Sequence, residues 1–177
     1  ITSELQQVVD HYVDAGKGIF KVVELENNVG LGAALNEGLN YCTNELVARL
    51  DNDDIALSWR CELQLKEFES DRELDIVGSY VEEFSGDESN IIGVRKVPLT
   101  QEAIIHFAKQ RNPFNHSSVM FKKSKVIACG NYSKMRTNQD VDLWVRMLLA
   151  GCKAKNIPQA LVLFRFDDNT YKRSKDW

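Results

Sequence analysis

Apolar residues recur along the chain with two spacings, one typical of helices and one typical of strands. A spacing of about 3.6 residues predicts amphipathic helices; these cover residues 3–15, 31–42, 58–69 and 139–150, and a further helix after Thr100 carries Ile104 and Phe107. Short β-branched and apolar runs bounded by turn residues predict strands, here at 20–25, 46–50, 75–84, 91–97, 118–122, 154–157 and 160–166.

The order of these elements predicts the fold class. Strands and helices alternate through the first half of the chain, which is the pattern of βαβ units and a parallel sheet, and the second half is more mixed. We therefore expect an α/β fold, Rossmann-like, with a mostly parallel sheet flanked by helices and with added antiparallel strands. A length of 177 residues fits one domain.

Composition and charge narrow the function classes. The chain has 22 Lys and Arg against 26 Asp and Glu, a formal net charge of −4. This balance argues against a non-specific nucleic-acid binder, which needs an excess of clustered cations. No stretch comes near the roughly 20 consecutive apolar residues of a membrane span, so a cytoplasmic protein is expected. The tail with Lys172, Arg173, Lys175 and Trp177 is compatible with loose contact at the inner face of a membrane.

The first chemical signal is an acidic cluster, Asp51-Asn52-Asp53-Asp54, at the carboxyl end of an apolar strand. Ligands of open α/β sheets bind beyond the carboxyl ends of strands. Closely spaced carboxylates suit a hard divalent cation such as Mg²⁺ or Mn²⁺, which completes its shell with substrate phosphate oxygens. The pattern predicts a phosphate ester or diphosphate ligand. The alternative is a solvated turn that caps the next helix.

An EF-hand calcium loop is a second alternative for this cluster. Asp51, Asp53 and Glu62 fall at its first, third and twelfth positions, but Ile55 occupies the fifth and Ala56 replaces the required glycine. We reject this reading.

Two further groups of residues could carry chemistry. Asn28 and Gly30 precede a predicted helix, with Asn36 inside it; a glycine turn at a helix N-terminus favours anions, although such turns are more often structural. Asp140 begins another predicted helix, where it is either an acid favoured by the helix dipole or a general base. His116, in a loop fixed by a proline, is either a structural histidine or a ligand.

Taken in order, these pieces resemble the family 2 glycosyltransferases, which have the GT-A nucleotide-sugar-binding fold. The matching stretches are Asn28-x-Gly30, Ala34-Leu35-Asn36-x-Gly38, Leu50-Asp51-x-Asp53-Asp54, Asn112-Pro113-Phe114-x-His116, Gln139-Asp140-x-Asp142-Leu143-Trp144 and Phe164-Arg165. Relative to the family pattern, the first strand, helix and second strand are missing. The resemblance therefore implies a single domain over residues 1–177 that is incomplete at its N-terminus, with a nucleotide-sugar-binding part at 1–84 and a part for the acceptor and catalytic base at 85–177.

The resemblance also implies roles for single residues. Asp140 would be the catalytic base. The donor would contact the residues Asn28, Gly30, Asn36, Asp51, Asp53 and Arg165. A divalent cation, Mn²⁺ or Mg²⁺, would be held by Asp53, Asp51 and His116.

The implied function is an inverting, metal-assisted transfer of a sugar from a nucleoside-diphosphate sugar to an acceptor hydroxyl, in the synthesis of a polysaccharide or glycoconjugate. The expected acceptor is a glycan or a lipid-linked glycan. Two alternatives remain open, a sugar nucleotidyltransferase and a non-catalytic domain that binds a nucleotide sugar.

Overall fold

A computed structural model describes residues 1–16 and 18–166 of the chain. The predicted membrane-contacting tail, with Lys172, Arg173, Lys175 and Trp177, lies outside these residues. The helices are α1 (Ser3–Ala15), α2 (Leu31–Tyr41), α3 (Arg60–Ser70), α4 (Gln101–Ala108), α5 (Lys123–Ala128), α6 (Gln139–Leu149) and the 3₁₀ turn η1 (His116–Ser118). The strands are β1 (Leu46–Ala48), β2 (Ile55–Ala56), β3 (Leu74–Phe84), β4 (Ile91–Arg95), β5 (Met120–Lys122) and β6 (Lys153–Arg165).

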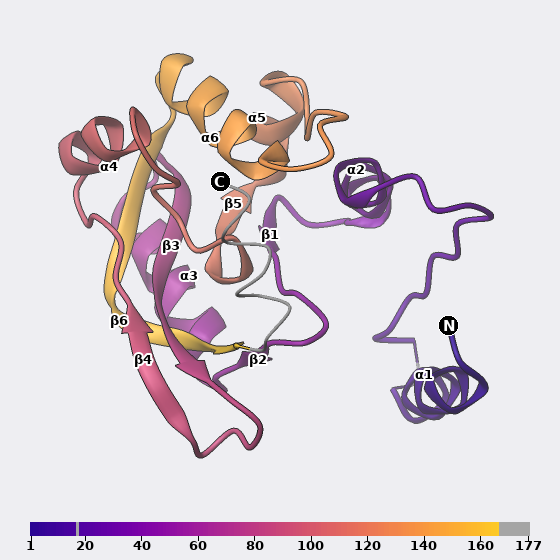
Figure 1. The fold of residues 1–177 in the computed structure, drawn as a ribbon. Coiled ribbons are helices and arrows are strands. Elements are labelled where there is room, and N and C mark those ends of the chain that lie inside the picture. The colour runs from indigo at the N-terminus through magenta and orange to yellow at the C-terminus, as the bar shows by residue number, and fades with distance from the viewer. Residues whose placement is uncertain (17, 167–177) are drawn as a thin grey trace.

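The strands form one mixed sheet with helices on both faces (Figure 1). Its order is β1-β5-β3-β6-β2, and β4 pairs with β3. Consecutive residues of β3 alternate between the two faces, so Ile76 belongs to a core beneath α5 and α6, whereas Val77 belongs to a second core beneath α3. Phe121 and Met120 of β5 divide between the same two cores.

The prediction of a mostly parallel sheet is wrong for the described residues. Only β3 and β6 pair in parallel; the other pairings, β1–β5, β3–β5, β3–β4 and β2–β6, are antiparallel. The reason lies in the first predicted βαβ unit. Residues 20–25 form no strand, so the unit that would have added a parallel strand before α2 is not formed.

The long pair β3–β6 organises the sheet. The structure joins the predicted strands 154–157 and 160–166 into one strand, β6. Gly78 allows a close approach to its neighbour, because an added Cβ would lie 2.1 Å from Asn156 Oδ1. The Asn156 amide donates to the carbonyls of Pro98, at 2.6 Å, and Pro113, at 3.1 Å, and thereby fixes the segment that leads to η1.

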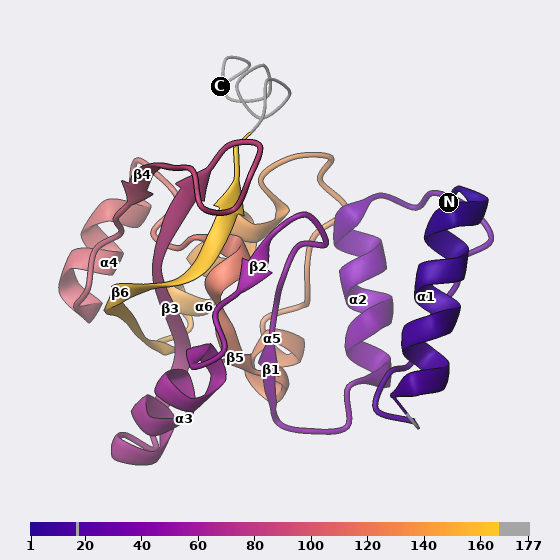
Figure 2. The same cartoon turned by 90° about the horizontal axis from the view of Figure 1, so that it is seen from below.

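The helix α1 lies farthest from the sheet, beyond α2 (Figure 2). The apolar spacing predicts that one face of this helix is packed, yet Leu5, Val8 and Tyr12 are between 51% and 57% exposed. Tyr12 makes an edge contact with Phe20, with ring centres 6.4 Å apart. No helix within the described ranges is both long and apolar enough to cross a membrane.

Candidate active site

An acidic turn follows β1 directly. Its carboxylates, from Asp51, Asp53 and Asp54, each offer one oxygen within 4.8 Å of the others. Asp53 is exposed, Asp51 is partly exposed and Asp54 is buried. The Asp54 amide donates to the Asp51 carbonyl at 3.3 Å, which closes the turn and brings the three side chains together.

Two of these carboxylates are held by neighbouring side chains. The buried Arg49 guanidinium donates to both oxygens of Asp51, with Nη1 2.6 Å from Oδ2. Asp54 Oδ1 accepts from the Arg165 amide at 2.9 Å, and the Ser117 hydroxyl lies between Asp54 and Asp51, 3.0 Å from Asp51 Oδ2. Burial raises the pKa of Asp54. The side chain of Asp53 has no such partner in the part of the chain that the structure describes.

The donor set of the acidic turn fits a hard divalent cation. It offers only carboxylate oxygens, which Mg²⁺ and Mn²⁺ prefer. Asp53 would supply the least engaged carboxylate, and Asp51 retains lone pairs that its two bonds to Arg49 do not use. His116 does not belong to this group of carboxylates in the described structure; its role as a metal ligand stays a prediction.

The second acidic feature is Asp140, in the first turn of α6. The Asn112 amide nitrogen donates to Asp140 Oδ2 at 2.7 Å. That amide is itself oriented, because its oxygen accepts from the Phe114 amide at 3.2 Å. Oδ1 of Asp140 has no hydrogen-bond partner among the described residues, so it is free to accept a hydrogen bond.

His116 lies beside the same carboxylate, with Nδ1 4.0 Å from Asp140 Oδ2. Its Nε2 is 3.0 Å from the Tyr132 hydroxyl. Burial lowers the pKa of His116 well below 6.5, with a smaller contribution from the positive charge of Arg49. Burial also raises the pKa of Tyr132. A neutral imidazole therefore lies against a protonated phenol, and Asp140 has no cationic partner on this side.

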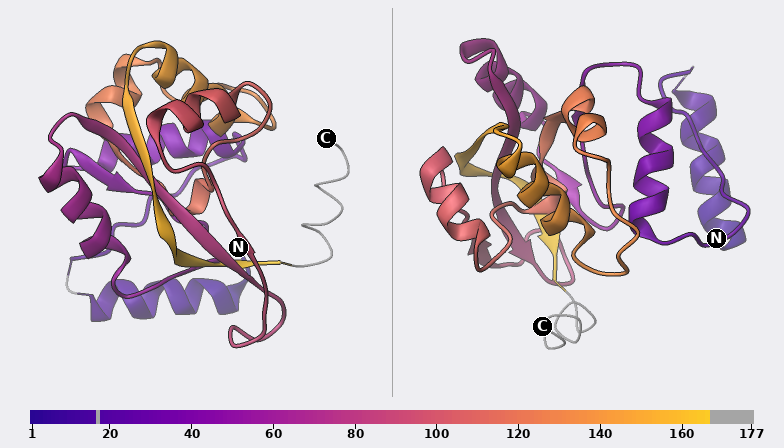
Figure 3. Two further views of the ribbon diagram at one scale, coloured as in Figure 1. Left: turned by 90° about the vertical axis from the view of Figure 1, so that its left-hand side faces the viewer. Right: turned by 90° about the horizontal axis from the view of Figure 1, so that it is seen from above.

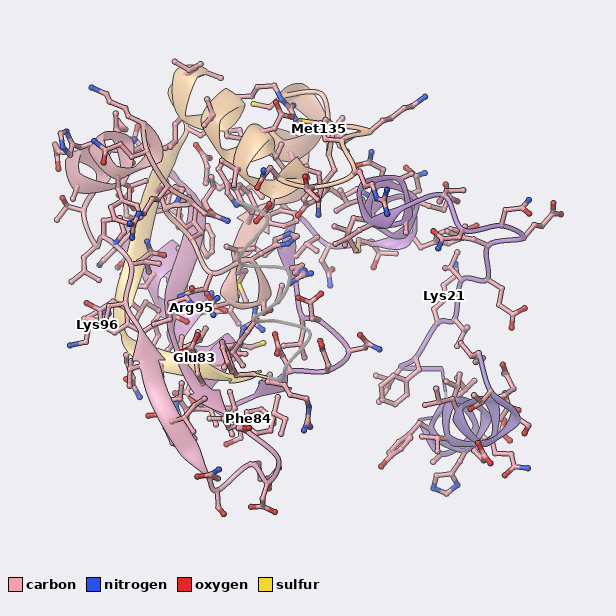
Figure 4. All side chains as sticks on the ribbon, in the orientation of Figure 1. Lys21, Glu83, Phe84, Arg95, Lys96 and Met135 are labelled. Atoms are coloured by element: carbon pink, nitrogen blue, oxygen red, sulfur yellow. The ribbon has the colours of Figure 1, made fainter. Side chains whose placement is uncertain are left out.

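Asp51 of the acidic turn and Asp140 line one cavity, whereas Asp53 and Asp54 are not among its lining residues. The cavity has a volume of about 400 Å³ and is lined by Asp51, Arg95, Lys96, Val97, Phe107, Arg111, Asn112, Phe114, Asn115, His116, Ser117, Asp140 and Phe164. Arg95 is ion-paired to Glu83, with its guanidinium 4.5 Å from the centre of the Phe164 ring. Arg95 and Lys96 extend to opposite sides of their segment (Figure 4). The cavity is thus lined by two carboxylates, Asp51 and Asp140, and by three cations, Arg95, Lys96 and Arg111.

Other predicted donor-binding residues lie elsewhere. Asn28 Oδ1 accepts from the Gly30 amide at 3.0 Å, and both residues are exposed outside the cavity lining. The Asn36 side-chain nitrogen donates to the Tyr132 carbonyl at 2.8 Å, and the Asn36 side-chain oxygen accepts from the Tyr132 amide at 2.9 Å. It therefore fixes the residue that contacts His116. Their donor-binding roles stay predictions.

Arg165 supports the acidic turn from β6. Its Nε donates to the Asp53 carbonyl at 3.1 Å and its Nη1 to the Gly86 carbonyl at 3.2 Å. The guanidinium also lies 4.5 Å from the centre of the Phe84 ring. In this arrangement the side chain holds the turn, and contact with a donor stays a prediction.

Sequence reasoning missed several residues of the site. Arg49, Ser117 and Asn112 make the bonds that orient the carboxylates. Asn112 lies in the motif around His116, and Arg49 lies two positions before the acidic turn. Proximity to recognised motifs was the only available signal.

Comparison with known proteins decides the family. The family model described as Glycosyl transferase family 2 matches residues 2–133. The chain belongs to glycosyl transferase family 2. It is 40% identical over 176 residues to the UDP-Gal:alpha-D-GlcNAc-diphosphoundecaprenol beta-1,3-galactosyltransferase of Escherichia coli, covering 98% of this chain and 62% of the relative. It is 40% identical over 156 residues to the amylovoran biosynthesis glycosyltransferase AmsE of Erwinia amylovora, covering 88% of this chain and 58% of the relative.

Solved structures place this family 2 domain in the GT-A fold. TarS 1-349 of S. aureus in complex with UDP-GlcNAc matches with a TM-score of 0.72 and 16% identity, over 94% of this chain and 47% of that one. The mannosyltransferase PcManGT of Pyrobaculum calidifontis, in complex with GDP-Man and Mn²⁺, matches with a TM-score of 0.70 and 14% identity, over 98% of this chain and 48% of that one. The predicted family and the predicted GT-A, α/β fold are confirmed, with a mixed sheet in place of the mostly parallel one.

Proposed function

We propose that this family 2 domain transfers a sugar from a nucleoside-diphosphate sugar to an acceptor hydroxyl, with inversion at the anomeric carbon. The observation that carries the proposal is the single cavity lined by both Asp51 and Asp140. The acidic turn provides a site for a donor diphosphate, and Asp140 provides a base on another wall. Two differently placed carboxylate groups allow donor activation and proton removal at separate points.

Asp140 acts as the general base. Its Oδ2 is held by Asn112 and its Oδ1 accepts the proton of the acceptor hydroxyl. The acceptor oxygen attacks the anomeric carbon from the face opposite the diphosphate. The bond from that carbon to the diphosphate oxygen breaks, and its electron pair leaves with the diphosphate. A single displacement of this kind inverts the configuration and needs no covalent intermediate.

Asp53 and Asp51 would hold the divalent cation. When bound, it supplies charge neutralisation to the departing diphosphate. Arg49 fixes the carboxylate of Asp51, which lines the cavity, and Arg165 keeps the backbone of Asp53 in place. His116, neutral beside Asp140, leaves that carboxylate free to take a proton.

The acceptor in this proposal is a lipid-linked glycan. The relative from Escherichia coli is named for an acceptor on diphosphoundecaprenol, and the Erwinia relative is named for amylovoran synthesis. The reaction would take place on the cytoplasmic side of a membrane, in polysaccharide or glycoconjugate synthesis. The donor part at 1–84 and the acceptor part at 85–177 each contribute one acidic feature of the cavity.

The direct test is a transfer assay with the full-length protein. Labelled UDP- and GDP-sugars are supplied with a sugar linked through diphosphate to a lipid, and the configuration of the new linkage is determined by NMR. We expect transfer with inversion. A retained configuration, or formation of a sugar nucleotide from a sugar phosphate instead of transfer, would contradict the proposal.

Substitution in the acidic turn tests the cation site. Asp53→Ala should weaken manganese-dependent binding of the nucleoside diphosphate, measured by calorimetry, about tenfold or more, because it removes the least engaged carboxylate. The matched control is Asp14→Ala, an exposed carboxylate of α1. An unchanged manganese requirement in Asp53→Ala would exclude this residue as a ligand.

A further inference from the structure

An apolar groove runs between α4 and α6 at a distance from the acidic turn. It has a volume of about 170 Å³ and is lined by Ile105, Ala108, Lys109, Val145, Leu148 and Leu149. Leu149 is 83% exposed and Ile105 is 41% exposed. The two helices lie next to each other when the molecule is viewed from above (Figure 3). Large apolar side chains left in water on adjoining helices mark a binding surface.

A second hollow connects this groove with the cavity. It shares Ala108 and Lys109 with the groove, and it shares Arg111 and Asn112 with the cavity that contains Asp140. Val141 and Met135 also line it; Met135 lies on the segment before α6 (Figure 4). The three hollows are therefore neighbours, joined by shared lining residues, in a series from Asp140 to Leu149, which we call the path.

Cations stand at the two junctions of this path. Lys109 lies where the apolar groove meets the middle hollow, and Arg111 lies where the hollow meets the cavity. Neither side chain has an ion-pair partner among residues 1–16 and 18–166. Asp142 also lines the middle hollow, but it is ion-paired to Arg146 at 2.8 Å. The charged side chains that line the middle hollow, Lys109, Arg111 and Asp142, therefore carry a net positive charge.

We propose that this path is the acceptor site, with the hydrocarbon chain of a diphosphate-linked acceptor in the α4–α6 groove and its diphosphate on Lys109 and Arg111. The inference rests on the proposed function and names the surface that selects the acceptor. A sugar joined through diphosphate to a hydrocarbon chain presents a hydroxyl, an anion and an apolar segment in that order. The path presents the proposed base Asp140, then the cations Arg111 and Lys109, and then the apolar groove, in the same order.

Binding of the hydrocarbon chain in the apolar groove is tested with the double variant Ile105→Ser/Leu149→Ser. Both side chains are exposed, so the fold should survive, which a thermal melt checks. Two acceptors carry the same sugar diphosphate, one with a methyl ester and one with a hexadecyl ester. We expect the KM for the hexadecyl acceptor to rise about tenfold, the equivalent of about two methylene groups returned to water, with no change for the methyl acceptor. The control is Ile127→Ser, an apolar residue on α5 that is 49% exposed.

The contact between the charge of Lys109 and the acceptor diphosphate is tested with Lys109→Gln. Loss of one charge–phosphate contact should raise the KM for both diphosphate acceptors several-fold and leave the KM for a phosphate-free glycoside unchanged. Arg72→Gln, an exposed cation before β3, serves as the control. An equal effect on the phosphate-free glycoside would overturn the assignment of the diphosphate to this position.

A binding measurement separates this inference from the proposed function. A fluorescent hexadecyl diphosphate without a sugar is titrated into the full-length protein in the absence of donor. Binding that weakens in Ile105→Ser/Leu149→Ser and in Lys109→Gln supports the acceptor path even where no transfer is detected. Binding that these variants leave unchanged overturns it. A shift from dimer to monomer in sedimentation, with unchanged binding of the probe, also overturns it and assigns the groove to self-association.

Discussion

His116 is a buried imidazole whose environment disfavours its charged form. The ring packs edge-on against Trp144, with centres 5.9 Å apart, and bonds the Tyr132 hydroxyl. Burial lowers its pKa, and the charge of Arg49 adds to the effect. A neutral ring suits a position next to a base, because an imidazolium would hold the Asp140 carboxylate in its ionised form and make it a weaker proton acceptor.

The lowered pKa predicts a specific dependence of stability on pH. Below a pH of 6.5 the unfolded chain protonates this histidine while the folded protein does not. As the pH is lowered below 6.5, the free energy of unfolding therefore decreases by up to about 1.4 kcal/mol per pH unit, until the pH reaches the pKa of the folded state. The variant His116→Gln should lose this part of the dependence, as measured by urea unfolding at several pH values. The exposed His106→Gln is the control, and an equal slope in wild type and His116→Gln would refute the prediction.

Single residues of the candidate site were predictable where their own side chains form a recognisable local pattern. The sequence pattern indicated Asp51 and Asp140, and both line the cavity. It could not indicate their partners, since the bond from Ser117 to Asp51 joins residues 66 positions apart. Nor could it indicate that the Asn36 amide donates to the carbonyl of Tyr132, 96 positions away; contact of Asn36 with a donor stays a prediction. Long-range hydrogen bonds of this kind leave no local signal.

At the scale of elements, α3 supports the site through two buried polar residues one turn apart. Arg60 donates to the carbonyls of Arg49 at 2.7 Å and Val119 at 3.1 Å. Gln64 donates to the carbonyls of Val77 at 2.9 Å and Ser118 at 2.8 Å. Burial lowers the pKa of Arg60 to about 10, so it stays charged at neutral pH. One helix thus joins the end of β1, the η1 segment and β3.

Removal of the Gln64 amide should weaken this support. Gln64→Met keeps the length of the side chain but leaves two buried carbonyls and the Arg60 Nε without their bonds. We expect the free energy of unfolding to fall by about 1–3 kcal/mol in a urea titration. Gln159→Met, at an exposed position of β6, should change it by less than about 0.5 kcal/mol. A similar small effect in Gln64→Met would show that these bonds contribute little.

The longer helices and strands of the described chain were predictable from periodicity, whereas the short helix α5 (Lys123–Ala128) and the pairing of strands were not. Helix α6 spans residues 139–149 where the pattern indicated 139–150. Residues 20–25 have the composition of a strand but no strand neighbour in the described structure, because β propensity needs a partner to take effect. The direction of each pairing depends on contacts between distant segments, which a local pattern does not encode.

At the scale of the whole molecule, the cavity brings together residues that are far apart in the sequence. Asp51 follows β1 and Asp140 lies in the first turn of α6; β5 pairs with both β1 and β3, and β3 pairs with β6, which follows α6. The walls of the cavity therefore depend on the assembled sheet. The path along α4 and α6 adjoins the same cavity, so the proposed donor site, base and acceptor surface are parts of one arrangement.

The variant Asp140→Asn tests the central claim most directly. Turnover is measured with saturating donor and acceptor, and the Kd of the nucleoside-diphosphate sugar is measured by calorimetry with manganese present. Because the amide keeps the shape but cannot take a proton, we predict that kcat falls by about 10²–10⁴ while the donor Kd stays within about twofold. Asp142→Asn, on the same helix and paired with Arg146, is the matched control and should keep most of its turnover. Equal losses of donor binding and turnover in Asp140→Asn, or full activity, would contradict the account.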